Sequence, residues 1–105
     1  MDVKELTTIA KEITAAYATK NQADGHKAWN VEQYMSGFVG DVGDLQKLVM
    51  AKQNYRHKDD VDEKLAHELS DCLWSILVIA DCLSVDIEVT YKKNMEQLLK
   101  KVTSL

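Results

Sequence analysis

Four acidic residues, arranged as two pairs, are the part of this sequence whose types and spacing could do chemistry. Asp41 and Asp44 are three positions apart, and Glu68 and Asp71 repeat that spacing. Residues three apart in a helix are neighbours on one face. Carboxylate oxygens are the ligands that Mg²⁺ and Mn²⁺ prefer. If the two pairs lie on facing helices, their side chains converge and can hold a divalent metal ion.

Helices must position these pairs, and the composition predicts an all-α chain. The sequence has no Pro, four Gly and 46% hydrophobic residues, which is typical of packed helices. Apolar residues recurring at a spacing of three to four predict helices over about residues 3–20, 31–54, 61–83 and 87–101. We find no strand alternation, internal repeat or low-complexity tract.

Capping residues indicate where these helices begin. Asn30 with Gln33, and Asp60 with Glu63, have the spacing of a capping box. Asp86 is expected to cap the last helix. The capping box at Asn30 marks the start of the helix that carries the first acidic pair. The capping box at Asp60 marks the start of the helix that carries the second acidic pair.

The short connections predict antiparallel neighbours, so residues 1–105 are expected to form one domain, a four-helix antiparallel bundle. A hairpin of the second and third helices would bring the acidic pairs level. The third helix is apolar over much of its circumference, which indicates a central or interface helix. Because a chain of this size builds only a thin core, we expect a homo-oligomer.

Several classes of protein do not fit the sequence. A net charge of -4 gives no indication of a nucleic-acid polymer as partner. The longest apolar run, residues 72–80, is too short to span a bilayer, and the charged N-terminus does not resemble a signal peptide. Cys72 and Cys82 are ten residues apart on one helix, about 15 Å, so they cannot pair. They are predicted to be reduced core residues of a cytoplasmic protein.

The residues alone leave the role of the acidic pairs open. Acidic pairs at helical spacing are usually solvated surface, and four converging carboxylates need cations, protonation or separation. Gly37, Gly40 and Gly43 recur every third residue inside the predicted second helix, where each costs about 1 kcal/mol relative to Ala. They predict a close approach of another backbone or of a ligand.

The sequence around both pairs resembles the MazG-like family of all-α nucleoside triphosphate pyrophosphohydrolases. GFVGDVGDL, residues 37–45, is similar to the family's glycine-flanked first motif. HELSDCLWSILVIADCLSVDI, residues 67–87, is similar to its ELGDVLWYL motif with an LGIDL tail. The resemblance covers Trp29 to Leu99. Both Glu of the family's ExxE motif are Asp here, one methylene shorter, and Gly40 stands where some members carry a further Glu.

This resemblance implies hydrolysis of a nucleoside triphosphate to the monophosphate and pyrophosphate, in the cleaning of nucleotide pools, with Mg²⁺ or alternatively Mn²⁺ as cofactor. It implies that Asp41, Asp44, Glu68 and Asp71 are the metal ligands and catalytic carboxylates. It leaves the carboxylate that acts as base unassigned. It also implies that the homo-oligomer is a dimer or a tetramer. The alternatives are a nucleotide- and metal-binding module with little or no turnover, and a purely structural helical bundle.

Substrate contacts are expected from residues around the acidic pairs. Trp29 and Asn94 match positions that the family places near substrate, and the remaining candidates are Phe38 as a platform for the base and Lys47 as a phosphate contact. Lys52, Arg56 and Lys58 are further cations near the first motif, and a solvated face is the alternative for each lysine. Trp74 is expected to pack in the core or in a dimer interface. No His has a partner at metal-ligand spacing.

Overall fold

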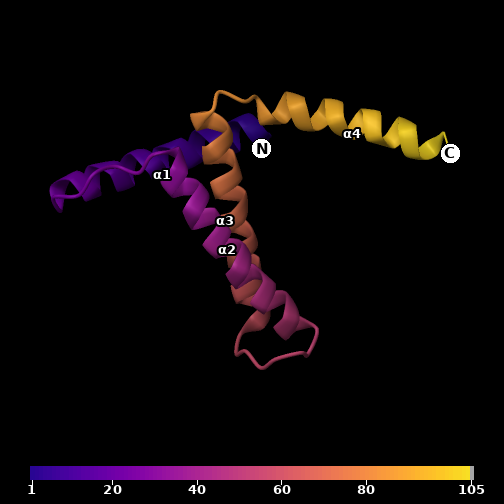
Figure 1. Cartoon of the computed structure of the whole chain (residues 1–105), viewed down its shortest axis with the longest axis horizontal. Helices are drawn as coiled ribbons and strands as arrows, with labels where there is room; N and C mark the ends of the chain where they lie inside the picture. Colours follow the sequence, from indigo (N-terminus) through magenta and orange to yellow (C-terminus); the bar gives the residue numbers. More distant parts are fainter. Residues whose placement is uncertain (105) are drawn as a thin grey trace.

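The computed structural model describes residues 1–104, and its regular structure is entirely helical (Figure 1). The helices are α1 (Val3–Ala23), α2 (Val31–Lys52), α3 (Val61–Cys82) and α4 (Ile87–Thr103). The prediction of an all-α chain with four helices is confirmed. The observed ends differ from the predicted ones by one to three residues.

The helix starts agree with two of the three predicted caps. Asn30 and Gln33 form a complete capping box, in which each side chain accepts a hydrogen bond from the other's backbone N–H. The Asp86 side chain accepts a hydrogen bond from the Val89 N–H at the start of α4. The capping box predicted at Asp60 is wrong. Asp60 adopts a left-handed conformation, with φ 54° and ψ 39°, and its side chain makes no capping hydrogen bond to α3.

Three helices end in the same way, at a residue with positive φ. Gly25, Asn54 and Ser84 follow α1, α2 and α3 with φ of 79°, 65° and 57°. After α2, the Tyr55 N–H donates to the Met50 carbonyl and the Asn54 N–H donates to the Ala51 carbonyl. This pair of bonds defines a Schellman motif. Asn54 therefore stops α2 rather than extending it, which explains why the helix is shorter than predicted.

The helices α2 and α3 form an antiparallel hairpin whose closed end is the loop of residues 53–60 (Figure 1). The helix α1 crosses the open end of this hairpin and packs against α3. The core lies at that crossing, where Ala10, Leu77 and Val78 are buried and partly buried side chains such as Leu6 and Trp74 cover them. Of the two roles predicted for α3, a central or an interface helix, the chain shows the central one: α3 packs against both α1 and α2 and has five buried residues, more than any other helix.

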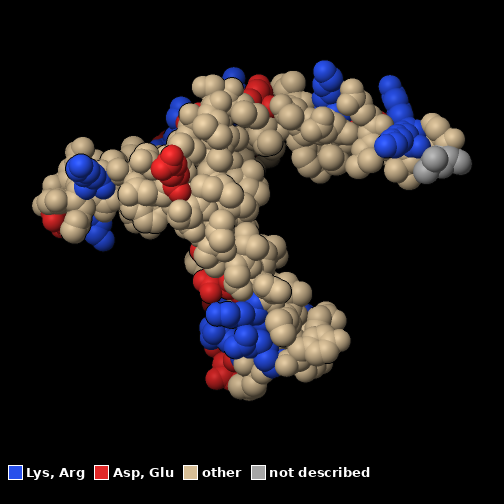
Figure 2. Space-filling model, viewed as in Figure 1, with Lys and Arg blue, Asp and Glu red and all other residues tan. Residues whose placement is uncertain are grey.

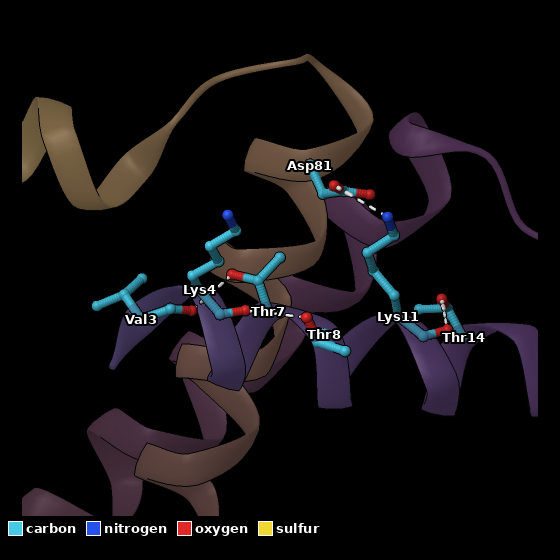
Figure 3. A network of polar contacts seen from close by, with 7 residues as sticks. All are labelled: Val3, Lys4, Thr7, Thr8, Lys11, Thr14 and Asp81. Atoms are coloured by element: carbon cyan, nitrogen blue, oxygen red, sulfur yellow. Dashed lines mark hydrogen bonds and ion pairs between the residues drawn. The ribbon is translucent and has the colours of Figure 1, made fainter. Parts of the chain in front are cut away.

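Polar contacts also tie α1 to α3. The Lys11 ammonium lies 3.8 Å from an Asp81 carboxylate oxygen, and this pair bridges the two helices (Figure 3). The Trp74 indole N–H donates to the Ala10 carbonyl at 3.4 Å. Threonine hydroxyls along α1 bond back to its own carbonyls, as Thr7 does to Val3 at 2.9 Å. Trp74 is partly buried and packs against the core, which is one of the two places predicted for it.

The helix α4 does not lie alongside the other three. It extends away from the crossing, and only its first turn lies near α1 (Figure 1). None of its residues is buried. Within residues 1–104, therefore, one chain does not close into the four-helix antiparallel bundle that the short connections predict. Antiparallel packing is seen for α2 and α3 alone, because α1 crosses them and α4 diverges.

Two further sequence predictions can be compared with the structure. Cys72 is buried and Cys82 is exposed, and both thiols are free. The prediction of two core cysteines is thus correct for Cys72 and wrong for Cys82, which ends α3 and is exposed. No helix in the described part of the chain is long and apolar enough to cross a membrane.

The contrast between the two predicted capping boxes can be tested by mutation. Replacing Asn30 by Ala removes a side-chain cap and should lower the free energy of unfolding by about 1 kcal/mol. Replacing Asp60 by Gly removes no capping bond and relieves a left-handed residue, so it should leave stability unchanged or slightly raised. Urea unfolding followed by circular dichroism measures both. An equal loss in the two variants would contradict the assigned helix starts.

Candidate metal centre and its surroundings

The α2–α3 hairpin brings carboxylates from both acidic pairs together. One oxygen each of Asp41, Asp44 and Glu68 lies within 4.8 Å of the other two. Asp41 and Asp44 come from one face of α2, and Glu68 comes from the facing side of α3. The prediction that an antiparallel hairpin brings the pairs level is confirmed for these three residues, which we call the acidic cluster.

The cluster is held in a partly dry environment. Glu68 Oε1 is buried and has no hydrogen-bond partner. Asp41 is half-buried, whereas Asp44 is exposed. Two charges 4.8 Å apart repel by about 3.5 kcal/mol at an effective dielectric constant of about 20, and less where water screens them, as at Asp44. The hairpin therefore concentrates negative charge at a point where water only partly solvates it.

Burial raises the pKa of the Glu68 carboxyl above its ordinary value, because the charged form loses hydration. The carboxylates of Asp41, Asp71 and Asp44 raise this pKa further, because each disfavours a second negative charge beside it. Burial also raises the pKa of the neighbouring Cys72 thiol, and Asp41, Glu68 and Asp71 add to the effect. Cys72 is thus kept as a neutral thiol, and the negative charge belongs to the carboxylates.

Asp71 is placed differently from the other three acids. One of its carboxylate oxygens lies 3.3 Å from His67 Nε2, one helical turn earlier on α3. Asp71 is close enough to raise the pKa of Glu68, but it is not in the closest group of carboxylates. This pairing of His67 with Asp71 was not predicted from the sequence. The signal was present, because residues four apart on a helix face one another.

An open cleft of about 760 Å³ adjoins the acidic cluster toward the closed end of the hairpin. Four cationic side chains line it, together with an imidazole and four carboxylates: Lys47, Arg56, Lys58 and Lys64, with His67, and Asp44, Asp60, Glu63 and Glu68. Figure 2 shows blue side chains gathered beside red ones near this end of the molecule. We call this the basic cleft. Lys47, predicted as a phosphate contact, lies in this lining, and so does Lys64, which was not predicted.

A smaller pocket of about 330 Å³ lies at the opposite side of the cluster, with Asp41 in its lining. The rings of Trp29 and Tyr34 meet edge to face with centroids 5.6 Å apart, and Tyr34 meets Trp74 in the same way at 5.9 Å. Asn21 and Tyr17 of α1 also line this aromatic pocket. Trp29 is therefore placed beside the acids as predicted. Asn21 and Tyr17 were missed, because nothing in the sequence places α1 across the hairpin.

Two other predicted substrate residues are not brought to the acidic cluster. Phe38 is half-buried on α2 and lines neither the basic cleft nor the aromatic pocket. Asn94 is exposed on α4, which extends away from the hairpin (Figure 1). Within a single chain, therefore, Asn94 does not lie near the carboxylates.

The three glycines of the first motif have different surroundings. A Cβ built at Gly37 would lie 3.2 Å from a ring carbon of Trp29. The predicted close approach is thus found at Gly37, where an indole ring lies against the helix. Nothing lies within 4 Å of a Cβ built at Gly40 or Gly43.

The acidic cluster suits a divalent metal ion by its donor set. It offers three carboxylates, and one buried oxygen has no hydrogen-bond donor to satisfy it. Hard oxygen ligands of this kind bind Mg²⁺ or Mn²⁺. Asp41, Asp44 and Glu68 would hold such an ion, and it would compensate the charge that the hairpin concentrates.

Comparison with known proteins adds no relative to this description. No protein-family model matches the chain, and neither a curated protein nor a solved structure matches it. The conclusions about the site therefore rest on its own residues and geometry.

Adding a divalent ion should stabilise the folded protein. At an ion concentration of about 100 times Kd, binding contributes about 2.7 kcal/mol, which raises Tm by roughly 10 °C or more in a domain of this size. Differential scanning calorimetry with Mg²⁺ or Mn²⁺ measures the shift. Glu68→Gln should abolish it, and Glu32→Gln, at an exposed acid in the first turn of α2, should retain it. An equal shift in both variants would show that the ion acts elsewhere.

The raised pKa of Glu68 predicts how the metal-free protein responds to pH. A carboxyl whose pKa is higher in the folded state favours folding most when it is protonated, so its contribution falls as pH rises through the folded value. Glu68→Gln should therefore be more stable than wild type at about pH 7 and nearly equal at about pH 4. Urea midpoints at the two pH values check this. A difference that does not change with pH would contradict it.

The open surroundings of Gly40 make a further prediction. Gly40→Ala should stabilise α2 by about 1 kcal/mol, because Ala favours a helix and the new methyl group meets nothing within 4 Å. Gly37→Ala should gain less than this, because its methyl group presses on Trp29. Trp29 fluorescence should shift in Gly37→Ala and not in Gly40→Ala. A larger gain for Gly37→Ala would contradict the placement of the indole.

Proposed function

We propose that this protein is a metal-dependent nucleoside triphosphate pyrophosphohydrolase of the MazG-like kind, converting a (d)NTP to the (d)NMP and pyrophosphate. The observation that carries the proposal is the position of the acidic cluster between two different surfaces. The basic cleft adjoins it on one side, and the aromatic pocket adjoins it on the other. A nucleoside triphosphate has the same order of parts: a planar base, then an α-phosphate, then a chain of negative charge.

The basic cleft supports binding of the triphosphate chain. Lys47, Lys64 and Arg56 line it beside Asp44 and Glu68, so cations adjoin the proposed metal ligands. Phosphate oxygens are bound by guanidinium and ammonium donors, and arginine can make two parallel hydrogen bonds. The alternating signs of charge favour a polyphosphate bridged by a metal ion, because free carboxylates alone would repel it.

The aromatic pocket supports binding of the base and sugar. Its volume, about 330 Å³, is at the small end of the range of ligand-binding sites. The half-exposed indole of Trp29 and the ring of Tyr34 offer faces on which a planar base can stack. The Asn21 amide, in the same lining, can donate and accept hydrogen bonds with the base edge.

The reaction follows from this arrangement. When bound, Mg²⁺ neutralises phosphate charge and lowers the pKa of a coordinated water. Water attacks the α-phosphorus, the bond from that phosphorus to the bridging α–β oxygen breaks, and pyrophosphate leaves with the bond's electron pair. The attacking water gives its proton to a carboxylate oxygen, among the four proposed acids, that does not bind the metal ion. Asp71 remains in the proposed set of four acids, held by His67 at the edge of the cluster.

A second candidate function is a nucleotide- and metal-binding module with little turnover. It is favoured by Asp44, which is exposed and one methylene shorter than the Glu of the family motif, and by Gly40, where some family members carry a further acid. Calorimetry that detects nucleotide and metal binding without product formation would select this candidate.

The proposed hydrolase would act in the cytoplasm on the free nucleotide pool.

Activity should depend on the acidic cluster. Release of pyrophosphate from a panel of canonical and modified dNTPs, with Mg²⁺ or Mn²⁺, is expected for the wild type. Asp44→Asn should lower kcat/KM by at least about 100-fold, a transition-state loss of about 2.7 kcal/mol. Arg56→Ala should mainly raise KM, by about tenfold, because it removes a phosphate contact.

Glu32→Gln serves as the matched control, since Glu32 is an exposed acid in the first turn of the same helix, and its rate should equal that of wild type. Absence of pyrophosphate release from every nucleotide would contradict the proposal. So would an unchanged rate in Asp44→Asn, because the released product would then come from a contaminating enzyme.

A further inference from the structure

The chain exposes far more surface than its size predicts. A folded protein of 11.9 kDa exposes about 5,900 Å², whereas this chain exposes 8220 Å². Its radius of gyration is 16.9 Å, against about 13 Å for a compact chain of this length. The excess is about 2,300 Å² per chain. Two copies that each bury this excess would form an interface of about 4,600 Å², within the range of obligate homodimers.

The helix α4 contributes to this excess, because none of its residues is buried. At about 100° per residue, Tyr91, Met95, Leu98 and Val102 fall on one stripe of this helix. Their exposed fractions are 63%, 41%, 51% and 56%. An apolar stripe of this regularity is typical of a helix that packs against a partner. In the chain itself, only the first turn of α4 lies beside another helix.

A groove with an apolar lining, like the α4 stripe, lies between α1 and α3. It has a volume of about 480 Å³ and its apolar lining includes Leu6, Ile9, Ile13, Leu73, Trp74 and Leu77. Tyr17 closes the α1 side, so the groove follows α1 from Leu6 to Tyr17, and the α4 stripe runs from Tyr91 to Val102. In each of these two spans, the first and last residues are eleven positions apart in sequence, which corresponds to about 17 Å along a helix axis.

The two surfaces also differ in the sign of their charge. The four Lys and two Glu of α4 give that helix a net charge of +2, so the remainder of the chain carries -6. Asp41 and Asp71 line the groove. Lys92 flanks one edge of the α4 stripe and Lys101 flanks the other, by the same helical geometry. A helix seated in the groove would therefore bring lysines toward carboxylates whichever way it runs.

We propose that α4 of a second copy of this chain occupies the α1–α3 groove, and that the exchange is reciprocal. Each copy offers one stripe and one groove, so two copies related by a twofold axis satisfy both. The docked helix completes, between two chains, the four-helix packing that a single chain leaves open. The argument for this interface does not depend on the proposed enzymatic function.

The exchange also changes which carboxylates lie near Asn94, and the inference about this residue rests on the proposed function. Asn94 lies beside Lys101 on one edge of the α4 stripe. In its own chain it is remote from the acidic cluster. In the exchanged dimer this edge borders the other copy's groove, which Asp41 and Asp71 line. The exchange therefore brings Asn94 to the border of a groove that two of the proposed site acids line.

Cross-linking between two distinguishable copies of the full chain tests the exchange. One copy carries Ile13→Cys and a large tag, and the other carries Leu98→Cys without a tag, both with Cys82→Ser because that native thiol is exposed. Co-expressed and treated with a short bis-maleimide, they should give a cross-link between the tagged and untagged chains. The matched control is Lys100→Cys, on the α4 face opposite the stripe, which should cross-link at least tenfold less.

Several outcomes would overturn the proposal. Light scattering that shows a monomer at about 10 μM, where an obligate dimer must persist, would do so. A Leu98→Cys chain that links only to another Leu98→Cys chain would show α4 pairing with α4. A cross-link confined within one chain carrying both substitutions would show α4 folding back on its own groove.

A second variant keeps the test independent of cross-linking chemistry. Leu98→Lys should raise the dissociation constant of the dimer at least tenfold while the helical circular dichroism is retained, and Lys100→Glu should leave that constant within threefold. Loss of pyrophosphate release with an intact dimer would count against the proposed function and not against this interface.

Discussion

The repulsion among carboxylates at the α2–α3 contact is the constraint on which the rest of the structure depends. Three carboxylates have oxygens within 4.8 Å of one another, and Oε1 of Glu68 is buried without a hydrogen-bond partner. Both features oppose the packing of the two helices that carry these side chains. The hairpin must be held together by other contacts. The α1–α3 core and the capping box at Asn30 supply part of this stabilisation, and a divalent cation would supply the remainder where the repulsion arises.

The same hairpin also explains why the site has two unlike sides. At its closed end, the loop of residues 53–60 adds Arg56 and Lys58 to lysines of α2 and α3, which produces the basic cleft. At its open end, α1 crosses and meets Trp29 and Trp74, which produces the aromatic pocket. The crossing helix also forms one wall of the apolar groove. The crossing of α1 over the hairpin thus links the proposed substrate site to the proposed dimer interface.

Local signals in the sequence were sufficient for the helices and for most of the acidic cluster. The spacing of Asp41 and Asp44, with Glu68 on the next helix, required only an antiparallel hairpin to become a cluster. Side-chain orientation and helix direction are set by tertiary contacts, and these were not predictable. Asp60 matched a capping box in sequence, yet its left-handed backbone prevents capping. Nothing in the local pattern of α4 distinguishes a helix packed on its own chain from one that is exposed.

The central claim is that the acidic cluster holds a divalent metal ion, because the charge balance and the proposed chemistry both depend on it. The most direct measurement is anomalous X-ray diffraction from crystals of the full chain soaked with Mn²⁺. The account predicts an anomalous peak between the carboxylates of Asp41, Asp44 and Glu68, at about 2.2 Å from their oxygens, and no such peak in crystals of Glu68→Gln. A well-ordered cluster without a peak, or peaks only at other sites, would contradict it.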